Sequence, residues 1–169
     1  MENSNQQLID SLNALIAKAI ISKKEYSVAT KKVVDTSTQN IFRKYALQRG
    51  FYIAQLQNQV TKLGGTCPQN GSRFEKMLRS WVYLKSIFTS RERNAVINNC
   101  VKGDEAVVKS YYAVLENFYI TDYVRLLIEA QIPGIELALV EMKLKRIVEE
   151  PFFISFFTYR KWISPAFSN

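Results

Sequence analysis

The side chains that most often carry out chemistry are unevenly represented in this chain of 169 residues. It contains no histidine and only two cysteines, Cys67 and Cys100, which lie far apart in the sequence. Two isolated thiols form neither a Cys-x-x-Cys pair nor the ligand spacing of a zinc site. Without histidine, a Cys-His nucleophile and a Ser-His-Asp triad are both excluded. Carboxylates, which can hold metal ions, remain as candidates.

Carboxylates are missing from one long part of the sequence. Between Thr36 and Phe74 there is no aspartate, glutamate or histidine. Helical bundles that hold two metal ions take ligands from all four helices. A helix formed by this segment therefore cannot supply its share of such a site.

The spacing of apolar residues predicts an all-α protein. Four long segments repeat apolar residues at steps of three, four or seven, the signature of amphipathic helices, and no useful β-type alternation appears. The first helix is expected at about 5–34. The second follows capping residues at 35–38 and ends at Gly64 and Gly65. The apolar stripes of these two helices contain Leu8, Leu12, Leu15, Ala19, Tyr26 and Val33, then Phe42, Ala46, Ile53, Leu56, Val60 and Leu63.

Three more helices are expected after the glycine-rich loop that follows Leu63. A short one spans about 74–89, and Ser90 caps a third long helix. A fourth begins at Thr121 or Asp122 and contains Pro133-Gly134, for which we favour one kinked helix over two helices meeting at a turn. The two stripes contain Ile97, Cys100, Val101, Val108, Tyr111, Leu115 and Phe118, then Val124, Ile128, Ile135, Leu139 and Met142.

Length and composition favour one bundle domain at 1–150 followed by an aromatic extension at 151–169. The first residues show no secretory pattern, and no uninterrupted apolar run is long enough to span a membrane. We therefore expect a soluble, cytoplasmic protein without a transmembrane segment.

Several segments carry a resemblance to a known family. The first two helices and the loop that follows them contain LIDSLNALI and KKEYSVA, then RGFYIAQL and LGGTCP. After them come the tryptophan-containing segment RSWVYLKSIF, the segment RERNAVINNCVKGDEAVVKSYYAVLENF and a last helix at 131–146. In this order and spacing they resemble an uncharacterised bacterial family of ferritin-like four-helix bundles, described as a domain of unknown function. The resemblance covers about residues 6–147. It implies an antiparallel four-helix bundle with one extra short helix between helices two and three.

The resemblance also implies an ancestral di-metal centre with one Glu from each of two helices and a Glu-x-x-His from each of the others. Glu25 and Glu105 stand where the single carboxylates belong, and Glu136 could begin a Glu-x-x-His, but Leu139 follows it. The middle of the second helix offers only Arg49, Tyr52 and Gln55. We therefore treat Glu25, Glu105 and Glu136 as vestigial candidates and predict no metal, no cofactor and no enzyme activity. One Mg²⁺ or Ca²⁺ held by the three glutamates, and three glutamates on the solvated flanks, remain alternatives.

Arg49 falls on the apolar phase of its helix, so its guanidinium is expected inside the bundle. Because a buried charge must be paired, we predict an internal ion pair with Glu25, Glu105 or Glu136. The alternative is a packed aliphatic stem with its head reaching solvent.

Positive charge is concentrated in the middle of the chain. Residues 36–91 hold nine basic residues against Glu75, which accounts for the whole net charge of +8. Such a flank can attract nucleic acid, an anionic surface or an acidic protein partner. We regard nucleic acid as a minor alternative because no DNA-binding motif is present. With Arg49 set aside, the basic patch consists of Arg43, Lys44, Lys62, Arg73, Lys76, Arg79, Lys85 and Arg91.

The extension after Pro151 is rich in aromatic residues. It is expected to form a short helix that docks on its own bundle or on a dimer mate, in preference to a membrane surface. The interface candidates are Phe152, Phe153, Phe156, Phe157 and Trp162.

Two functional classes follow from the sequence. The first is a non-catalytic bundle that acts as an interaction or structural protein, expected as a homodimer. The second is a metal-binding bundle with an altered carboxylate site for redox chemistry or storage.

Overall fold

The structure is a computed structural model that describes residues 2–67 and 92–148. Those residues contain no strand and form four helices: α1 (Glu2–Thr30), α2 (Thr36–Lys62), α4 (Arg93–Leu115) and α5 (Asp122–Val148). The predicted all-α fold is confirmed. The short helix expected at about 74–89 and the aromatic extension at 151–169 lie outside the described residues.

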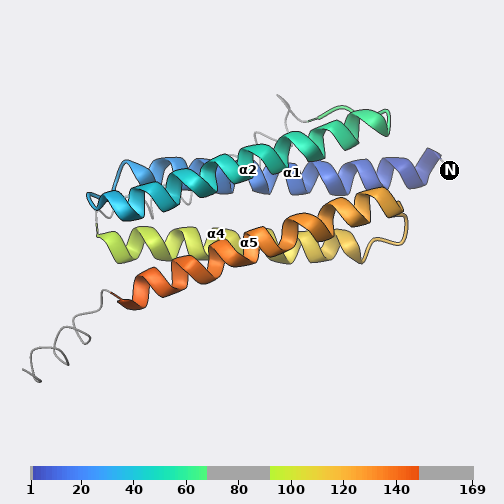
Figure 1. Cartoon of the computed structure of the whole chain (residues 1–169). Helices are drawn as coiled ribbons and strands as arrows, with labels where there is room; N and C mark the ends of the chain where they lie inside the picture. Colours follow the sequence, from blue (N-terminus) through green and yellow to red (C-terminus); the bar gives the residue numbers. More distant parts are fainter. Residues whose placement is uncertain (1, 68–91, 149–169) are drawn as a thin grey trace, which may run out of the picture.

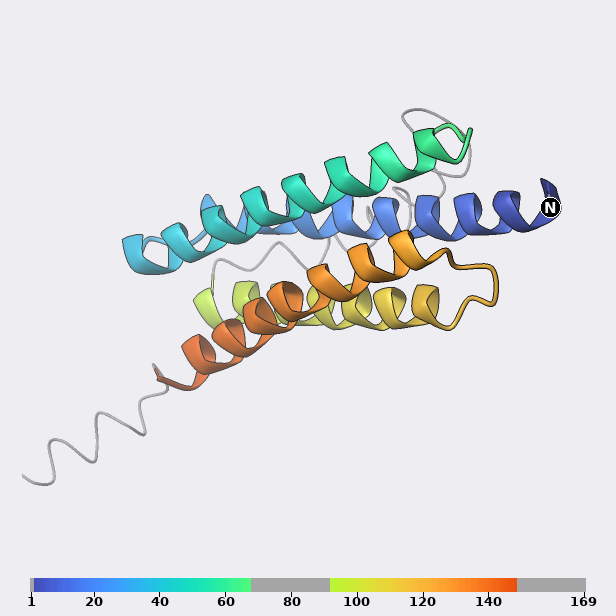
Figure 2. The same cartoon turned by 45° about the vertical axis from the view of Figure 1, so that its right-hand side comes forward.

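The helices form two antiparallel hairpins that lie against each other (Figure 1). α1 packs along α2, α4 packs along α5, and α1 joins the hairpins by packing along α4, as the turned view also shows (Figure 2). α2 and α4 run in the same direction, so the end of α2 and the start of α4 lie at opposite ends of the bundle. Bundles with one long crossover connection have this topology.

Local signals at the helix ends agree with the structure. The Asp35 side chain caps α2 by accepting hydrogen bonds from the backbone N–H of Ser37 at 3.2 Å and of Thr38 at 2.8 Å. Gly64 follows α2 with a φ of 79°, a conformation that glycine adopts without strain. α5 continues through Pro133, so the prediction of one helix there is confirmed.

One predicted core residue is wrong. α4 ends at Leu115, and Phe118 lies in the connection to α5 with 93% of its surface exposed. The apolar pattern continues past Leu115, but the helix does not. Among the described residues no helix has both the length and the apolar content needed to cross a membrane.

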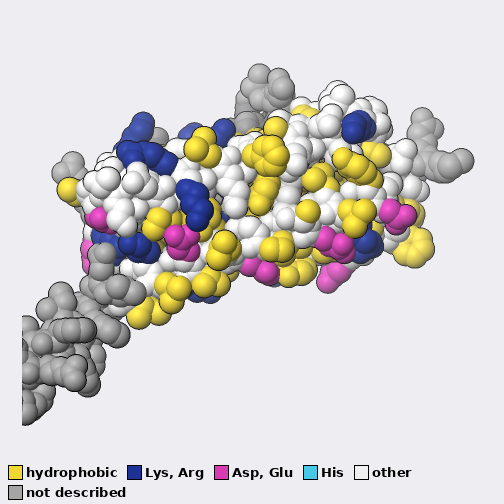
Figure 3. All heavy atoms as spheres, in the orientation of Figure 1, with side chains coloured by type: hydrophobic (Ala, Val, Ile, Leu, Met, Phe, Trp, Pro, Cys, Tyr) yellow, Lys and Arg dark blue, Asp and Glu magenta, His cyan; other side chains and the backbone are white. Residues whose placement is uncertain are grey.

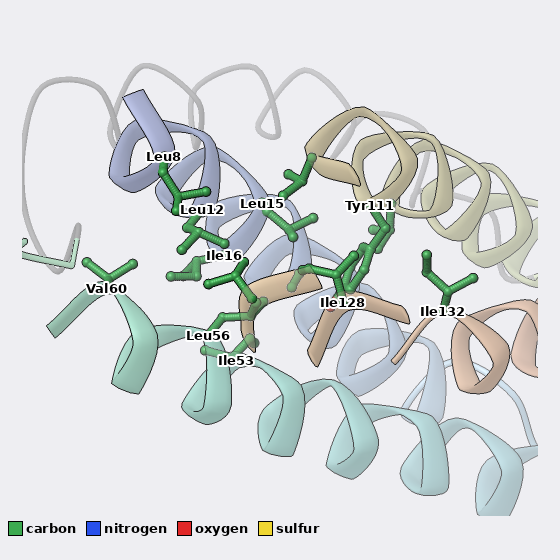
Figure 4. Close-up of a cluster of buried hydrophobic side chains, with 14 of the residues drawn as sticks. Leu8, Leu12, Leu15, Ile16, Ile53, Leu56, Val60, Tyr111, Ile128 and Ile132 are labelled. Carbon is green, nitrogen blue, oxygen red and sulfur yellow. The ribbon is translucent and has the colours of Figure 1, made fainter. Parts of the chain in front are cut away.

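The hydrophobic core consists of two clusters. In Figure 4 the side chains of the first cluster come from all four helices and point toward one another, including Leu12 of α1, Leu56 of α2, Tyr111 of α4 and Ile128 of α5. The second cluster lies toward the other end of the bundle. It contains Tyr26, Ala29, Val33, Phe42, Tyr45, Val96, Ile97, Cys100, Val101, Ala138 and Met142.

Along α1, α2 and α4, buried polar residues separate the two clusters. Ser22 and Glu25 lie between the clusters on α1, Arg49 does so on α2 and Asp104 does so on α4. The middle of the bundle is therefore polar, while both halves are mainly apolar.

Candidate functional site

The centre of the bundle contains an ion pair that is closed off from water. The Arg49 Nη2 atom donates to Asp104 Oδ1 at 2.9 Å, and both side chains are 0% exposed. The other terminal nitrogen, Nη1, donates to the Gln48 side chain. The guanidinium also lies 5.9 Å from the ring centre of Tyr26, within the range of a cation–π contact.

Asp104 is the hub of this site. Besides Arg49 of α2, it accepts hydrogen bonds from two residues of α1: Ser22 Oγ donates to Oδ1 at 3.0 Å, and the Tyr26 hydroxyl donates to Oδ2. The carboxylate on α4 is therefore bonded to three donors from two other helices. Such bonds replace the water that a buried carboxylate gives up.

The surroundings disfavour additional negative charge. Burial and the nearby Asp104 carboxylate raise the pKa of Tyr26 well above its ordinary value. Burial together with Glu25 and Asp104 does the same for the pKa of Cys100. The phenol and the thiol are therefore neutral at physiological pH, and Cys100 is not an activated nucleophile.

Glu25 also belongs to this layer. Its side chain is 4% exposed and lies against the backbone of α4. A β-carbon added to Gly103 would lie 2.1 Å from Glu25 Oε2, so the glycine leaves room for this carboxylate. Of the three predicted glutamates, Glu25 is the one at the centre.

The other two glutamates lie on the flanks. Glu105 Oε1 forms an ion pair with Lys143 Nζ at 2.8 Å, with both side chains exposed. Glu136 Oε1 accepts a hydrogen bond from the Tyr112 hydroxyl at 2.8 Å. The structure therefore does not bring the three predicted carboxylates together.

The prediction for Arg49 needs a correction. The guanidinium lies inside the bundle and is paired, but the ion-pair partner is Asp104 and not Glu25, Glu105 or Glu136. Sequence reasoning missed Asp104, although it lies on the same apolar phase of α4 as Ile97, Cys100 and Tyr111. Choosing Glu105 placed the inward face of α4 one residue too far along the chain.

A second polar chain links three helices beside the first core cluster. The Tyr111 hydroxyl donates to Gln131 Oε1 at 2.7 Å, and Gln131 Nε2 donates to Gln55 Oε1 at 2.8 Å. Gln131 is 2% exposed, so these bonds satisfy a buried amide. Gln55, one of the three residues noted at the middle of the second helix, accepts a hydrogen bond in this chain.

The predicted basic patch is only partly described. Arg43 donates to Asn40 and Gln39, Lys44 forms an ion pair with Glu141 at 3.2 Å, and Lys62 lies over the Tyr123 ring. The remaining members, and the predicted interface aromatics, lie outside the described residues. These are Arg73, Lys76, Arg79, Lys85 and Arg91, and Phe152, Phe153, Phe156, Phe157 and Trp162.

Among the described residues, few side chains that could bind a metal ion lie close together. Within residues 2–67 and 92–148, no group of three or more His, Cys, Asp or Glu side chains is arranged to hold a metal ion. At the centre, the Asp104 carboxylate is already bonded to three donors, one of which is the positively charged Arg49.

Comparisons with known proteins identify the family and the fold. Residues 7–117 match the model of a family described as a domain of unknown function, DUF2383. No curated protein matches the sequence.

Two solved structures are similar in fold. The first is a dodecameric thioferritin, the bacterioferritin-related protein of Bacteroides fragilis, with a TM-score of 0.70 and 12% identity over 95% of this chain and 92% of the other. The second is the DPS protein of Vibrio cholerae O1, described as a ferritin-like diiron-carboxylate protein. Its TM-score is 0.67, with 14% identity over 85% and 91% of the two chains.

Proposed function

Because the chain belongs to the DUF2383 family of unknown function and has a ferritin-like fold, we propose that it is a non-catalytic bundle acting as a structural or interaction protein. In this proposal the buried ion pair of Arg49 and Asp104 replaces a di-metal centre. The protein works through its surfaces, and it associates with further copies of itself.

The observation that carries the proposal is the wholly buried guanidinium of Arg49 at mid-bundle. It supplies the positive charge that balances a buried carboxylate, which is the role of the ions in a di-metal bundle. A divalent ion about 4 Å away would be repelled by roughly 8 kcal/mol at an effective dielectric constant of about 20. Arg49 and a metal ion therefore compete for one place.

The donor set supports the same proposal. Both oxygens of Asp104 are hydrogen-bonded, and a metal ion would have to displace Ser22, Tyr26 or Arg49. Glu105 and Glu136, which could complete a site, are bonded on the flanks. With no histidine in the sequence, the nitrogen ligands of a diiron bundle are also lacking.

Metal analysis tests the proposal directly. The full chain is dialysed to equilibrium against Mn²⁺, Zn²⁺ or anaerobic Fe²⁺, and bound metal is measured by mass spectrometry. We expect well under one ion per chain. Stoichiometric metal that disappears in the Asp104→Asn variant would overturn the proposal.

A reversal variant makes the test stronger. Arg49→Glu removes the central positive charge and places a third carboxylate beside Asp104 and Glu25. If Arg49 has taken the place of a metal ion, this variant gains Mn²⁺ binding and its melting temperature rises with Mn²⁺. Arg49→Met, which removes the charge without adding a ligand, is the matched control and should show neither effect.

A further inference from the structure

α5 has a second apolar stripe opposite the one that faces the core. Eight of its residues are exposed at alternating steps of three and four, and none of them is charged. They are Tyr123, Leu126, Ala130, Pro133, Leu137, Val140, Leu144 and Ile147. We call these eight residues the outer stripe.

The outer stripe is unusual for a helix at the surface of a bundle. Such a helix normally turns a polar face to water, but the six large apolar residues of this stripe keep between 51% and 65% of their surface exposed. Figure 3 shows apolar side chains on the visible face of the molecule, along the part where α5 lies. α5 is therefore apolar on two opposite sides.

Its spacing is that of a coiled-coil seam. Alternating steps of three and four are the a and d positions of a heptad, and here they continue along nearly the whole helix from Tyr123 to Ile147. Ridges with this repeat pack on another helix of the same repeat. The partner that best matches the stripe in length and period is another α5.

We propose that the outer stripe docks a second copy of this chain, with the two α5 helices antiparallel about a two-fold axis that crosses the stripe between Pro133 and Leu137. This deepens the proposed structural role by naming the surface, the partner and the orientation. A two-fold contact uses the same patch on both subunits, so a self-complementary stripe is what it needs.

The order of residues along the stripe fits the antiparallel arrangement. With the axis between Pro133 and Leu137, Tyr123 packs opposite Ile147 of the partner subunit and Leu126 opposite Leu144 of the partner subunit. The small Ala130 meets the partner's Val140, and Pro133 meets the partner's Leu137. Small residues thus lie opposite branched ones, which lets the helices approach closely.

Charges beside the stripe favour the same orientation. In the antiparallel pair, Glu129 faces Lys143 of the partner subunit, and the two-fold axis repeats this contact. A parallel pair would instead bring Glu136 close to the partner's Glu141, two like charges. The antiparallel pair also brings Glu136 near Glu136 of the partner subunit, but it forms the Glu129 contact with the partner's Lys143 twice, whereas the parallel pair has the repulsion between Glu136 and the partner's Glu141 twice. The antiparallel arrangement therefore has the better electrostatic match.

The test compares two valine substitutions in the full chain. Val140→Glu places a carboxylate in the proposed seam, whereas Val34→Glu makes the same change at a residue that is 94% exposed between α1 and α2. By sedimentation velocity, we expect the dimer Kd to rise roughly 100-fold or more for Val140→Glu, because a buried unpaired charge is costly. Val34→Glu should match wild type.

Cross-linking tests the orientation. In a Cys67→Ser background, Tyr123→Cys and Ile147→Cys are made as two single variants with tags of different size and are then mixed under oxidising conditions. An antiparallel pair gives mixed disulfides between the two variants. Disulfides within either variant alone would indicate parallel helices and overturn the orientation.

Four other results would overturn the proposed occupant. The first is a wild-type protein that stays monomeric at high concentration, and the second is self-association that survives Val140→Glu. The third is self-association that truncation after Val148 abolishes but Val140→Glu does not. The fourth is binding of anionic vesicles by wild type but not by Val140→Glu. The second points to another interface, the third to the C-terminal extension and the fourth to a lipid surface. Metal content measured on the same samples reports on the ion-pair proposal separately, so either proposal can fail alone.

Discussion

Arg49 and Asp104 lie 55 residues apart in the chain and on different helices, yet their charged groups meet at 2.9 Å with no exposure to solvent. Two opposite charges at this depth hold α2 and α4 in one register, because neither can shift without leaving the other unpaired. Taking both charges out of water is itself costly, so the pair fixes the arrangement of the helices more than it adds stability.

Breaking the pair on one side should be strongly destabilising. Asp104→Asn leaves the Arg49 guanidinium buried without a counter-charge, and we expect a loss of about 3–5 kcal/mol in the free energy of unfolding. Urea unfolding followed by circular dichroism measures it. The double variant Arg49→Met/Asp104→Asn should recover part of the loss, because neither charge of the pair remains to be left without its partner.

Glu105, the residue next to Asp104, provides the control for Asp104→Asn. Glu105→Gln removes the same charge one position along α4, but it breaks only the exposed pair with Lys143. Its effect should stay within about 1 kcal/mol. Equal losses for Asp104→Asn and Glu105→Gln, or a double variant less stable than Asp104→Asn, would show that Arg49 does not depend on Asp104.

The sequence is sufficient to predict the inward placement of Arg49 but not its partner. Arg49 falls in phase with Phe42 and Ile53, so helical periodicity alone places it inside. Asp104 and Glu105 are neighbours on α4, where one residue corresponds to a rotation of about 100°. The family resemblance places a carboxylate at Glu105, although the apolar stripe of α4 is in phase with Asp104, and the structure confirms the phase of the stripe.

The outer stripe of α5 was also not predicted from the sequence, although its spacing is visible there. Apolar residues fill both the core phase, which contains Ile128 and Ile135, and the opposite phase, which contains Leu137 and Leu144. Periodicity shows that both stripes exist, but only the packing of α4 and α2 against α5 decides which one the bundle buries. The sequence thus predicts the four helices well and the orientation of each less well.

A close approach between α2 and α5 depends on Gly134. A β-carbon at this position would lie 2.2 Å from the Tyr52 hydroxyl oxygen and 2.9 Å from Gln48 Nε2. We expect Gly134→Ala to lower the free energy of unfolding by about 1–3 kcal/mol, since the rigid phenol ring must move. Urea unfolding at neutral pH provides the measurement.

Removing the phenol oxygen should relieve this clash. In Tyr52→Phe the nearest ring atom lies where Tyr52 Cζ is now, 3.4 Å from the added β-carbon, so Gly134→Ala should cost much less in that background. Gly50→Ala is the control within a helix. Its β-carbon would meet only the flexible end of Lys23 at 3.3 Å, and alanine is the better helix former by roughly 0.5–1 kcal/mol. A Gly134→Ala variant as stable as Gly50→Ala would contradict the proposed contact.

The buried phenols predict a loss of stability in alkali. Burial raises the pKa of Tyr26 and of Tyr111 above the ordinary value. Above pH ~10 the unfolded chain releases these protons while the folded chain keeps them, so the free energy of unfolding falls as pH rises. The decrease should reach about 1.4 kcal/mol per pH unit for each group.

Urea unfolding between pH 8 and 10.5 checks this slope. Tyr111→Phe removes one titrating group, so its stability should fall less steeply above pH 10, although its hydrogen bond to Gln131 is lost at every pH. Identical slopes for wild type and Tyr111→Phe would mean that Tyr111 ionises equally in both states.

The two thiols should differ sharply in reactivity. Cys100 is 1% exposed, and burial together with Glu25 and Asp104 raises the pKa of its thiol. Cys67 is partly exposed, and burial alone raises the pKa of its thiol. With a chromogenic disulfide reagent at pH 8, one thiol per folded chain should react quickly, and this fast phase should be absent in Cys67→Ser.

The slow thiol then reports on the centre of the bundle. Cys100 lies on α4 one turn before Asp104, so the reagent reaches it only when the helices separate. Its rate should rise with urea and should be higher in Asp104→Asn than in Glu105→Gln, in proportion to the equilibrium population of open chains. A Cys100 that reacts equally fast in these two variants would show that the ion pair does not hold α4 in place.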